Sequence, residues 1–403
     1  MRVKFRVERD VLGEAVAFVA RALPARPVVP VLSGLLLHAD EGGIALSCFD
    51  YEVSARVHVS GDVGEPGTAL VPGRLLADIT RSLPPAEVEV STAAGMVMLT
   101  CGSAEFALVS LPLEEYPRLP ELPAAAGIVD GPLLATAAAQ VAPSASRDDT
   151  LPMLTGVSLE LEAGRLTLAA TDRYRLAVRT VSFEAVEPAV RASVLVPART
   201  LAEVARTMGA AGPVTIAVGQ PEQDGARPAD GLISFDGGGR RLTARLIGAD
   251  FVKYESRFKV AFDASAELPA GQFIDAVRRV SLVADRITPV QLAFHRDVAV
   301  IEAQSDGRAR AVESVPVRFD GADQVISFNP QYLLDGLAAA ALTPQSHGGP
   351  EQATAPGPGR IRLQFTSPAK PAVISWIDTE PPADAATAAF RYLVVPQRTQ
   401  VAG

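Results

Sequence analysis

One pattern of residues occurs three times in this chain, at a spacing that fits whole domains. Each copy contains a proline marker: Val71-Pro72-Gly73-Arg74, Val196-Pro197-Ala198-Arg199 and Asn329-Pro330-Gln331-Tyr332. The prolines are 125 and 133 residues apart, from 72 to 197 and from 197 to 330. Solenoid repeats are about 20–50 residues long, whereas single domains are commonly about 100–150 residues long. We therefore expect three copies of one domain, over residues 1–123, 127–259 and 266–403.

A second pattern precedes each marker and predicts the order of elements within a copy. Its three forms are Pro27–Gly34 with Phe49-Asp50-Tyr51, Asp149–Gly156 with Thr171-Asp172-Arg173, and Arg286–Leu292 with Ser305-Asp306-Gly307. Leu12, Val16, Val19 and Leu23 recur at helical spacing, and alternating apolar residues predict the strands that follow. Each marker predicts a second helix, because proline is tolerated at a helix start. The expected fold class is α+β, with two helices on one face of about eight strands in each copy.

Composition narrows the possible classes of function. The chain has 403 residues and a net charge of −9, so any contact with nucleic acid must come from a local basic surface. Cys48 and Cys101 lie in strand-like runs, which favours buried thiols over a disulfide framework. The first residues alternate like a strand rather than a signal peptide, and no apolar run approaches the ~18 residues that span a membrane. We expect a cytoplasmic protein with no membrane partner.

No set of residues in the sequence resembles a catalytic or metal centre. None of the four histidines pairs with another at metal-ligand spacing, and Gly237-Gly238-Gly239 lies between two strand-like runs, as a hairpin turn does. The paired acids Asp148 and Asp149 are the best candidates for metal-assisted chemistry. No histidine or second acid pair lies near them in the sequence, so a solvated turn is the simpler interpretation. We expect no metal, no cofactor and no enzymatic activity.

Arginines follow two of the markers at the same offsets. Arg74 and Arg81 flank Asp78 in the first copy, and the second copy repeats this arrangement with Arg199, Glu203 and Arg206. Residues seven apart share one face of a helix, so each helix presents two arginines together. One interpretation is a solvated face with ion pairs inside the helix. The other is a shared surface for an anionic ligand, to which Arg26, Arg147, Arg278 and Arg279 also contribute, in the manner of phosphate contacts without sequence readout.

The motifs in their order resemble one family. The chain carries Arg147-Asp148-Asp149 before Leu154-Thr155-Gly156, then Thr171–Ala177, the marker at Pro197, and Phe328–Leu333 in the last copy. These segments are similar to the bacterial DNA sliding clamp, the beta subunit of DNA polymerase III, most of all in its actinobacterial form. The resemblance implies three clamp domains, each with two helices and two small antiparallel sheets. It also implies a head-to-tail homodimer that forms a pseudo-six-fold ring.

The resemblance also implies partners and the residues that meet them. Double-stranded DNA would pass through the ring without sequence preference, next to Arg26, Arg74, Arg147 and Arg199. Spacing alone, rather than the resemblance, adds four further expected DNA-facing residues: Arg81, Arg206, Arg278 and Arg279. Phe106 and Leu282 are the expected dimer-interface residues. The DNA polymerase III alpha subunit, the clamp loader and other proteins with a clamp-binding motif would dock in a peptide pocket. The matching pocket positions are Leu154, Thr171, Arg173, Tyr174, Arg175, Leu176, Val252, Leu393, Val395, Pro396 and Arg398.

The sequence departs from the family pattern mainly in this pocket. Val252 stands where the pattern has proline, Arg257-Phe258-Lys259 replaces two aliphatic residues and a proline, and Gln397 replaces an apolar residue near the end of the chain. Losing flexible apolar side chains reduces the adaptable surface of a peptide groove. Our hypothesis is a variant clamp whose pocket excludes a competing ligand, such as a pocket-binding antibiotic, while it keeps its partners. Ordinary sequence drift is the alternative explanation.

Two further interpretations stay open at this level. A metal-dependent hydrolase or nuclease would use Asp148 and Asp149, and would lose activity on substitution of Asp148. A regulatory clamp homologue would form rings but bind no polymerase. The sequence does not separate this second possibility from a working clamp, because the departures lie in the partner pocket.

Overall fold

The computed structural model describes residues 3–210, 212–219, 231–285, 288–305, 308–342, 359–377 and 390–397. The chain forms two compact units. Unit 1 contains Met1–Ala126 and Ala211–Leu246, and unit 2 contains Gly127–Ala210 and Ile247–Gly403.

Unit 1 contains two sheets, both antiparallel. The first has the strand order β5-β1-β7-β8-β9, and the second runs β6-β2-β3-β4-β17-β16-β15. The strands are β1 (Lys4–Glu8), β2 (Gly34–Asp40), β3 (Gly43–Phe49), β4 (Val53–Val59), β5 (Asp62–Glu65), β6 (Gly67–Pro72), β7 (Glu87–Ala93), β8 (Met96–Cys101), β9 (Ala104–Val109), β15 (Pro213–Val218), β16 (Leu232–Gly237) and β17 (Arg240–Arg245). Strand β17 comes from the middle of the chain and pairs with β4, with Leu242 opposite Ala55.

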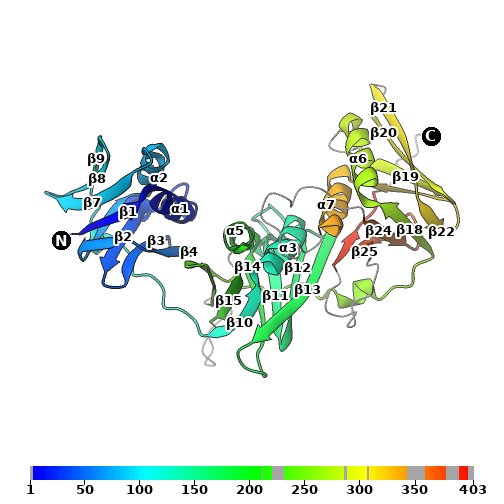
Figure 1. The fold of residues 1–403 in the computed structure, drawn as a ribbon. Coiled ribbons are helices and arrows are strands. Elements are labelled where there is room, and N and C mark those ends of the chain that lie inside the picture. The colour runs from blue at the N-terminus through cyan, green and yellow to red at the C-terminus, as the bar shows by residue number, and fades with distance from the viewer. Residues whose placement is uncertain are drawn as a thin grey trace. The chain divides into compact units, whose positions relative to one another are not determined.

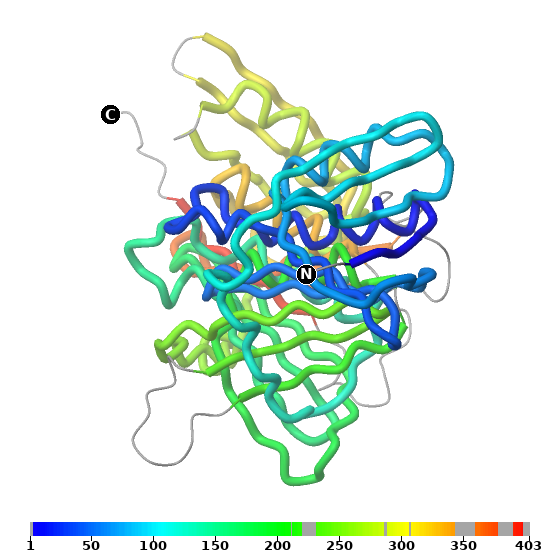
Figure 2. Tube along the Cα trace, turned by 90° about the vertical axis from the view of Figure 1, so that its left-hand side faces the viewer, coloured from blue at the N-terminus to red at the C-terminus, as the bar shows by residue number. Residues whose placement is uncertain are grey.

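Two helices cover unit 1, α1 (Arg9–Ala20) and α2 (Gly73–Ser82). They lie side by side, and α1 packs on β3 and β4 (Figures 1 and 2). The buried face of α1 is formed by Leu12, Val16 and Val19, as their spacing predicts. Cys48 and Cys101 are buried free thiols, which confirms the prediction from their strand-like surroundings.

Unit 2 repeats this plan on a larger scale. One antiparallel sheet has the order β14-β11-β12-β13-β26-β25-β24-β18-β22, and a second has β21-β20-β19-β23. The strands are β10 (Ala125–Asp130), which pairs with β13 from Gly127 onward, β11 (Gly156–Glu162), β12 (Gly164–Thr171), β13 (Arg175–Ala185), β14 (Arg191–Pro197), β18 (Ala264–Pro269), β19 (Val290–His295), β20 (Val298–Ser305), β21 (Ala309–Pro316), β22 (Arg318–Asp320), β23 (Gln324–Phe328), β24 (Arg360–Phe365), β25 (Ala372–Ile377) and β26 (Arg391–Val394). Strand β26 therefore pairs with β13, from much earlier in the chain.

The helices of unit 2 form two further pairs (Figure 1). Helix α3 (Gly131–Val141) packs against α5 (Ala198–Met208), and α6 (Ala270–Val280) packs against α7 (Pro330–Ala341). A single turn, α4 (Pro152–Thr155), precedes β11. Gly336 allows α7 to approach β26 closely, because a Cβ there would lie 2.4 Å from the Tyr392 ring. No helix in the described residues is long and apolar enough to cross a membrane.

The residues of the two repeated motifs start helices and stabilise turns. Helices α2, α5 and α7 each begin at or directly after the marker proline, and Asn329 caps α7 by accepting hydrogen bonds from the amides of Gln331 and Tyr332. The predicted second helix of each copy is thus confirmed. Asp50 and Asp172 play the same part in the other motif, since each Oδ1 accepts the amides two and three residues later. Tyr51 and Arg173 follow these aspartates at φ 74° and 80°, which is uncommon for residues with a side chain.

Candidate peptide-binding and DNA-binding surfaces

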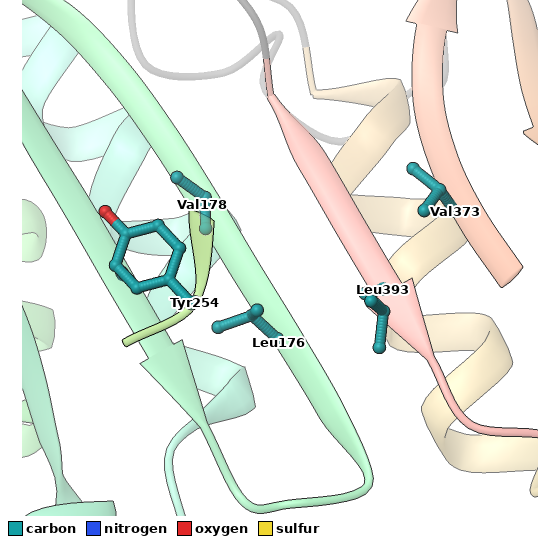
Figure 3. Close-up of a cluster of buried hydrophobic side chains, with 6 residues drawn as sticks. Leu176, Val178, Tyr254, Val373 and Leu393 are labelled. Atoms are coloured by element: carbon teal, nitrogen blue, oxygen red, sulfur yellow. The ribbon is translucent and has the colours of Figure 1, made fainter. Parts of the chain in front are cut away.

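A cluster of apolar side chains lies where β13 and β26 meet in unit 2 (Figure 3). We call it the apolar cluster. Its buried members are Ala169, Leu176, Val178, Tyr254, Val373 and Leu393, and Phe251, Phe258, Phe262 and Val395 pack against it half-buried. The cluster combines strands β12, β13, β25 and β26 with the segment after residue 250, so distant parts of the chain form one apolar surface.

Strand register explains why these side chains lie together. Leu176 is opposite Leu393, and Leu393 is opposite Val373 on the next strand. Residues directly opposite in a sheet project from the same face. Tyr392 projects from the other face, where its hydroxyl donates a hydrogen bond to the carbonyl of Tyr332 on α7. The apolar cluster therefore occupies the face of the sheet turned away from α7.

Tyr254 closes one side of the cluster. Its hydroxyl donates a 3.3 Å hydrogen bond to Oε1 of Glu160 on β11. Burial raises the pKa of Tyr254 and also raises the pKa of Glu160, although the hydrogen bond from Tyr254 opposes the rise for Glu160. A Phe-to-Tyr edge contact, with ring centroids 6.0 Å apart, holds Phe251 against Tyr254.

Arg175 organises the turn beside the cluster. Its Nε donates a 2.9 Å hydrogen bond to Asp172, and its Nη1 forms an ion pair with Asp335 of α7. The guanidinium also lies over the Tyr332 ring, 4.6 Å from the centroid, and Tyr332 stacks on Tyr174. Burial opposes the charge on Arg175, but Tyr392 and Asp335 raise its pKa above the ordinary value. A buried arginine thus joins β13 to α7.

The structure brings together part of the predicted pocket. Leu176, Leu393 and Val395 belong to or contact the apolar cluster. The turn residues Thr171, Arg173, Tyr174 and Arg175 adjoin it, and the carbonyl of Tyr174 accepts a hydrogen bond from the Val395 amide. The other predicted positions are not members of the cluster. Leu154 is buried in α4, Val252 is exposed, and Pro396 is half-buried. Arg398 lies outside the described residues.

Sequence reasoning missed three cluster members, Val178, Tyr254 and Val373, and also Phe258, which packs against the cluster. Val178 follows Leu176 by two, so strict alternation along the strand would have found it. Tyr254 and Phe258 lie in segments that the sequence marks only as departures from the family pattern. No sequence signal points to Val373, because its place depends on β25 pairing with β26.

The predicted DNA-facing arginines fall into two groups. Arg81, Arg206 and Arg278 each form an ion pair with the acid three residues earlier, and Arg279 donates a 3.0 Å hydrogen bond to Glu313 of β21. Among the described residues, no carboxylate partner is found for Arg26, Arg74, Arg147 or Arg199, all of which are exposed. Arg74 donates a 3.1 Å hydrogen bond to the carbonyl of Pro24. Within the part of the chain that the structure describes, the positions implied by the family resemblance are thus the ones without an acidic partner.

Two edge strands carry the predicted dimer residues or lie near them. Phe106 is half-buried on β9, which is an edge of its sheet, and Val109 at the end of β9 is 62% exposed. Strand β21 is an edge of the last sheet. Leu282 follows α6, in the 3₁₀ turn Ser281–Val283 that contacts β21, and is 82% exposed. Val109 and Leu282 are therefore accessible at the β9 edge and beside the β21 edge.

Family models match all three copies in order. The N-terminal, central and C-terminal domains of the DNA polymerase III beta subunit match residues 3–120, 129–253 and 260–344. The chain is 47% identical over 397 residues to the beta sliding clamp of Streptomyces coelicolor, which covers 98% of this chain and 99% of that protein. The chain belongs to the beta sliding clamp family. It is also 38% identical over 399 residues to the beta sliding clamp homolog GriR of Streptomyces muensis, covering 98% and 99% of the two chains.

Solved clamp structures share the fold. The sliding clamp of Pseudomonas aeruginosa, crystallised bound to griselimycin, matches with a TM-score of 0.84 at 25% identity, and covers 99% of this chain and 100% of that one. The Bacillus subtilis clamp has the same TM-score at 24% identity and the same coverage. The expected α+β fold of a three-domain sliding clamp is thereby confirmed.

The nuclease alternative finds no support in this sliding clamp. The exposed carboxylate of Asp148 accepts hydrogen bonds from the amide and the hydroxyl of Thr150, and those bonds lower its pKa. The described residues contain no group of three or more His, Cys, Asp or Glu that could hold a metal ion. Asp148 therefore stabilises a turn, as its surroundings in the sequence indicate.

Proposed function

We propose that two copies of this chain close head to tail into a ring that encircles duplex DNA and tethers replication proteins to it. One observation carries this proposal: two equivalent strand pairings are made within the chain, and the strands for a third are left at sheet edges. The strand after the Asp50 turn, β4, pairs with β17, and the strand after the Asp172 turn, β13, pairs with β26. In the third copy the equivalent strand is β21, and the first copy ends its sheet with β9, the counterpart of β17 and β26. Both β21 and β9 are sheet edges, so we propose that β21 of one chain pairs with β9 of the other.

The two internal pairings also give a register for the third. Val53 and Arg175 lie three residues after their turn aspartates and are opposite Ala244 and Val394. Both pairings are antiparallel. Ala309 likewise lies three residues after Asp306. Ala244 lies four residues after Arg240, the first residue of β17, and Leu108 lies four residues after Ala104, the first residue of β9. The equivalent pairing therefore sets Ala309 opposite Leu108 of the partner. Arg310 then faces Ala107, and Ala311 faces Phe106.

The ring performs its task by topology rather than by contact energy. Arg26, Arg74, Arg147 and Arg199, which have no acidic partner among the described residues, would meet phosphates without reading sequence, which permits sliding. The ion-paired arginines at 81, 206, 278 and 279 would add weaker contacts. The activity needs no catalytic group, so the proposed role is that of a non-enzymatic cytoplasmic processivity factor with three domains, over residues 1–123, 127–259 and 266–403.

The apolar cluster and the Arg175 turn form the proposed docking site for the DNA polymerase III alpha subunit, the clamp loader and other proteins with a clamp-binding motif. The clamp in one similar structure is bound to griselimycin, and the chain is also similar to GriR. Val252, at a position where the family pattern has proline, is exposed, and Phe258, where the pattern has an aliphatic residue, packs on the cluster. We therefore propose weaker griselimycin binding than in a standard clamp; equal affinity in both proteins would contradict this.

Sedimentation velocity tests the ring. The wild-type protein should have twice the mass of its 42.1 kDa chain, and Leu282→Asp or Phe106→Asp should shift it toward the monomer. Val186→Asp is the matched control, since Val186 is an exposed apolar residue directly after β13, in a different sheet from β9 and β21, and it should leave the dimer intact. A monomeric wild type, or a dimer unaffected by the edge variants, would overturn the proposal.

A further inference from the structure

A row of arginines crosses the sheet of unit 2 beside the apolar cluster. Strand pairing sets Arg318 of β22 opposite Glu267, Glu267 opposite Arg362, Arg362 opposite Ser375, and Ser375 opposite Arg391. Residues opposite one another project from one face, so these five side chains share a face. Arg360 lies on the same face, two residues before Arg362. We call Arg318, Arg360, Arg362 and Arg391 the arginine row.

Among the described residues, Glu267 is the carboxylate that pairs with the row. Glu267 is 3.8 Å from Arg318, 3.5 Å from Arg360 and 3.7 Å from Arg362, which exceeds a normal hydrogen-bond length in each case. The three arginine side chains are 75%, 43% and 41% exposed. Asp320, also exposed on β22, lies at one end of the adjacent row. Among the described residues, three guanidinium groups around Glu267, with that of Arg391 farther along the row, leave a local positive surface on a chain whose net charge is −9.

The arginine row is continuous with the apolar cluster. Val373 precedes Ser375 by two residues, and Leu393 follows Arg391 by two, so both rows project from the same face. The guanidinium of Arg391 lies over the Phe258 ring, 4.6 Å from its centroid, and Phe258 packs on the cluster. Arg391 is also opposite Val178, itself a member of the cluster. Successive same-face positions on a strand are about 7 Å apart, which one extended peptide can span.

We infer that the arginine row binds an acidic segment next to the apolar anchor of a partner's clamp-binding peptide. This inference rests on the proposed docking site. Exposed arginines at the rim of an apolar surface suit carboxylates, because they attract the peptide and fix its direction at little desolvation cost. A peptide is favoured over DNA because the row adjoins the apolar cluster on one sheet face, so one extended chain can place apolar side chains on the cluster and carboxylates on the row. A phosphate backbone offers no apolar side chains for the cluster.

Fluorescence anisotropy with paired peptides tests this inference. Both peptides carry the clamp-binding segment of a DNA polymerase III alpha subunit, one flanked by glutamates and the other by glutamines. At about 50 mM salt the glutamate peptide should bind the dimer about tenfold more tightly, and the difference should vanish near about 500 mM salt. The double variant Arg318→Gln/Arg362→Gln should remove the difference and leave the affinity for the glutamine peptide unchanged. Arg6→Gln, an exposed strand arginine paired with Glu89 in unit 1, is the matched control.

The outcomes distinguish a failure of the arginine-row inference from a failure of the proposed docking site. If neither peptide binds an intact dimer, the docking site is wrong and the inference fails with it. If both bind equally, the docking site stands and the role of the arginine row is overturned. If the glutamate flank gives no advantage but the double variant binds a short DNA duplex more weakly, the row binds phosphate, and the acidic-peptide inference is again overturned.

Discussion

Arg175 keeps its charge in a buried position because two carboxylates from different elements share its guanidinium. Its partner Asp335 is mostly buried on α7, so removing one charge leaves the other without full compensation. Asp335→Asn should lower the free energy of unfolding by about 3 kcal/mol. Asp275→Asn is the control, because it breaks an exposed pair with Arg278 and should cost at most about 0.5 kcal/mol. Urea denaturation measures both variants, and equal losses of stability would contradict the role given to Asp335.

Glu160 predicts a pH dependence of stability. Half-burial raises the pKa of Glu160, so the folded protein binds this proton more readily than the unfolded chain does. The resulting stabilisation is full below the ordinary pKa of glutamate and is lost as the pH rises through the raised value. Glu160→Gln should therefore gain stability relative to wild type between acid and neutral pH, by less than about 1 kcal/mol because solvent screens the group. A difference in melting temperature that stays constant over this range would speak against the raised pKa.

The proposed dimer depends on pairing between two edge strands, β21 of one chain and β9 of its partner. The proposed register places Arg310 of β21 opposite Ala107 of the partner's β9. The double variant Ala107→Cys/Arg310→Cys should form a covalent dimer on mild oxidation, visible on a non-reducing gel. The native thiols should not interfere, since both are buried and burial raises the pKa of Cys48 to about 12.

A shift of one residue provides the control for that cross-link. In Ala107→Cys/Ala311→Cys the two thiols should project from opposite faces of the sheet, and little covalent dimer should form. Equal cross-linking in both double variants would show that the register is wrong.

Local patterns predicted the elements better than they predicted the site. The Pro72, Pro197 and Pro330 markers predicted three helices, because proline and its neighbours fix a helix start through local backbone geometry. The apolar cluster depends on pairings between strands more than 200 residues apart, such as Leu176 with Leu393. No local signal specifies such a register, so Val373 and the arginine row emerged only from the sheet. The pocket residues predicted from the sequence came from family resemblance rather than from periodicity.

The whole molecule should bind DNA weakly when it is not threaded on it. Replacing Arg74 and Arg199 with glutamine should reduce the dependence of DNA affinity on salt concentration, by about one unit of slope for each phosphate that no longer meets an arginine. Arg165→Gln is the control, because Arg165 lies on strand β12 and not on a helix, and is paired with Glu162. Titrations at several salt concentrations measure the slopes, and the same slope for all variants would exclude these arginines from the DNA-binding surface.

Retention on circular DNA tests the central claim most directly. The protein would be loaded on nicked circular duplex with a clamp loader, separated from free protein by gel filtration, and then treated with a restriction enzyme that cuts the circle once. A ring held by topology should stay with the circle and leave within minutes of linearisation. Equal retention on circular and linear DNA would show that contact energy holds the protein, and would contradict the encircling ring.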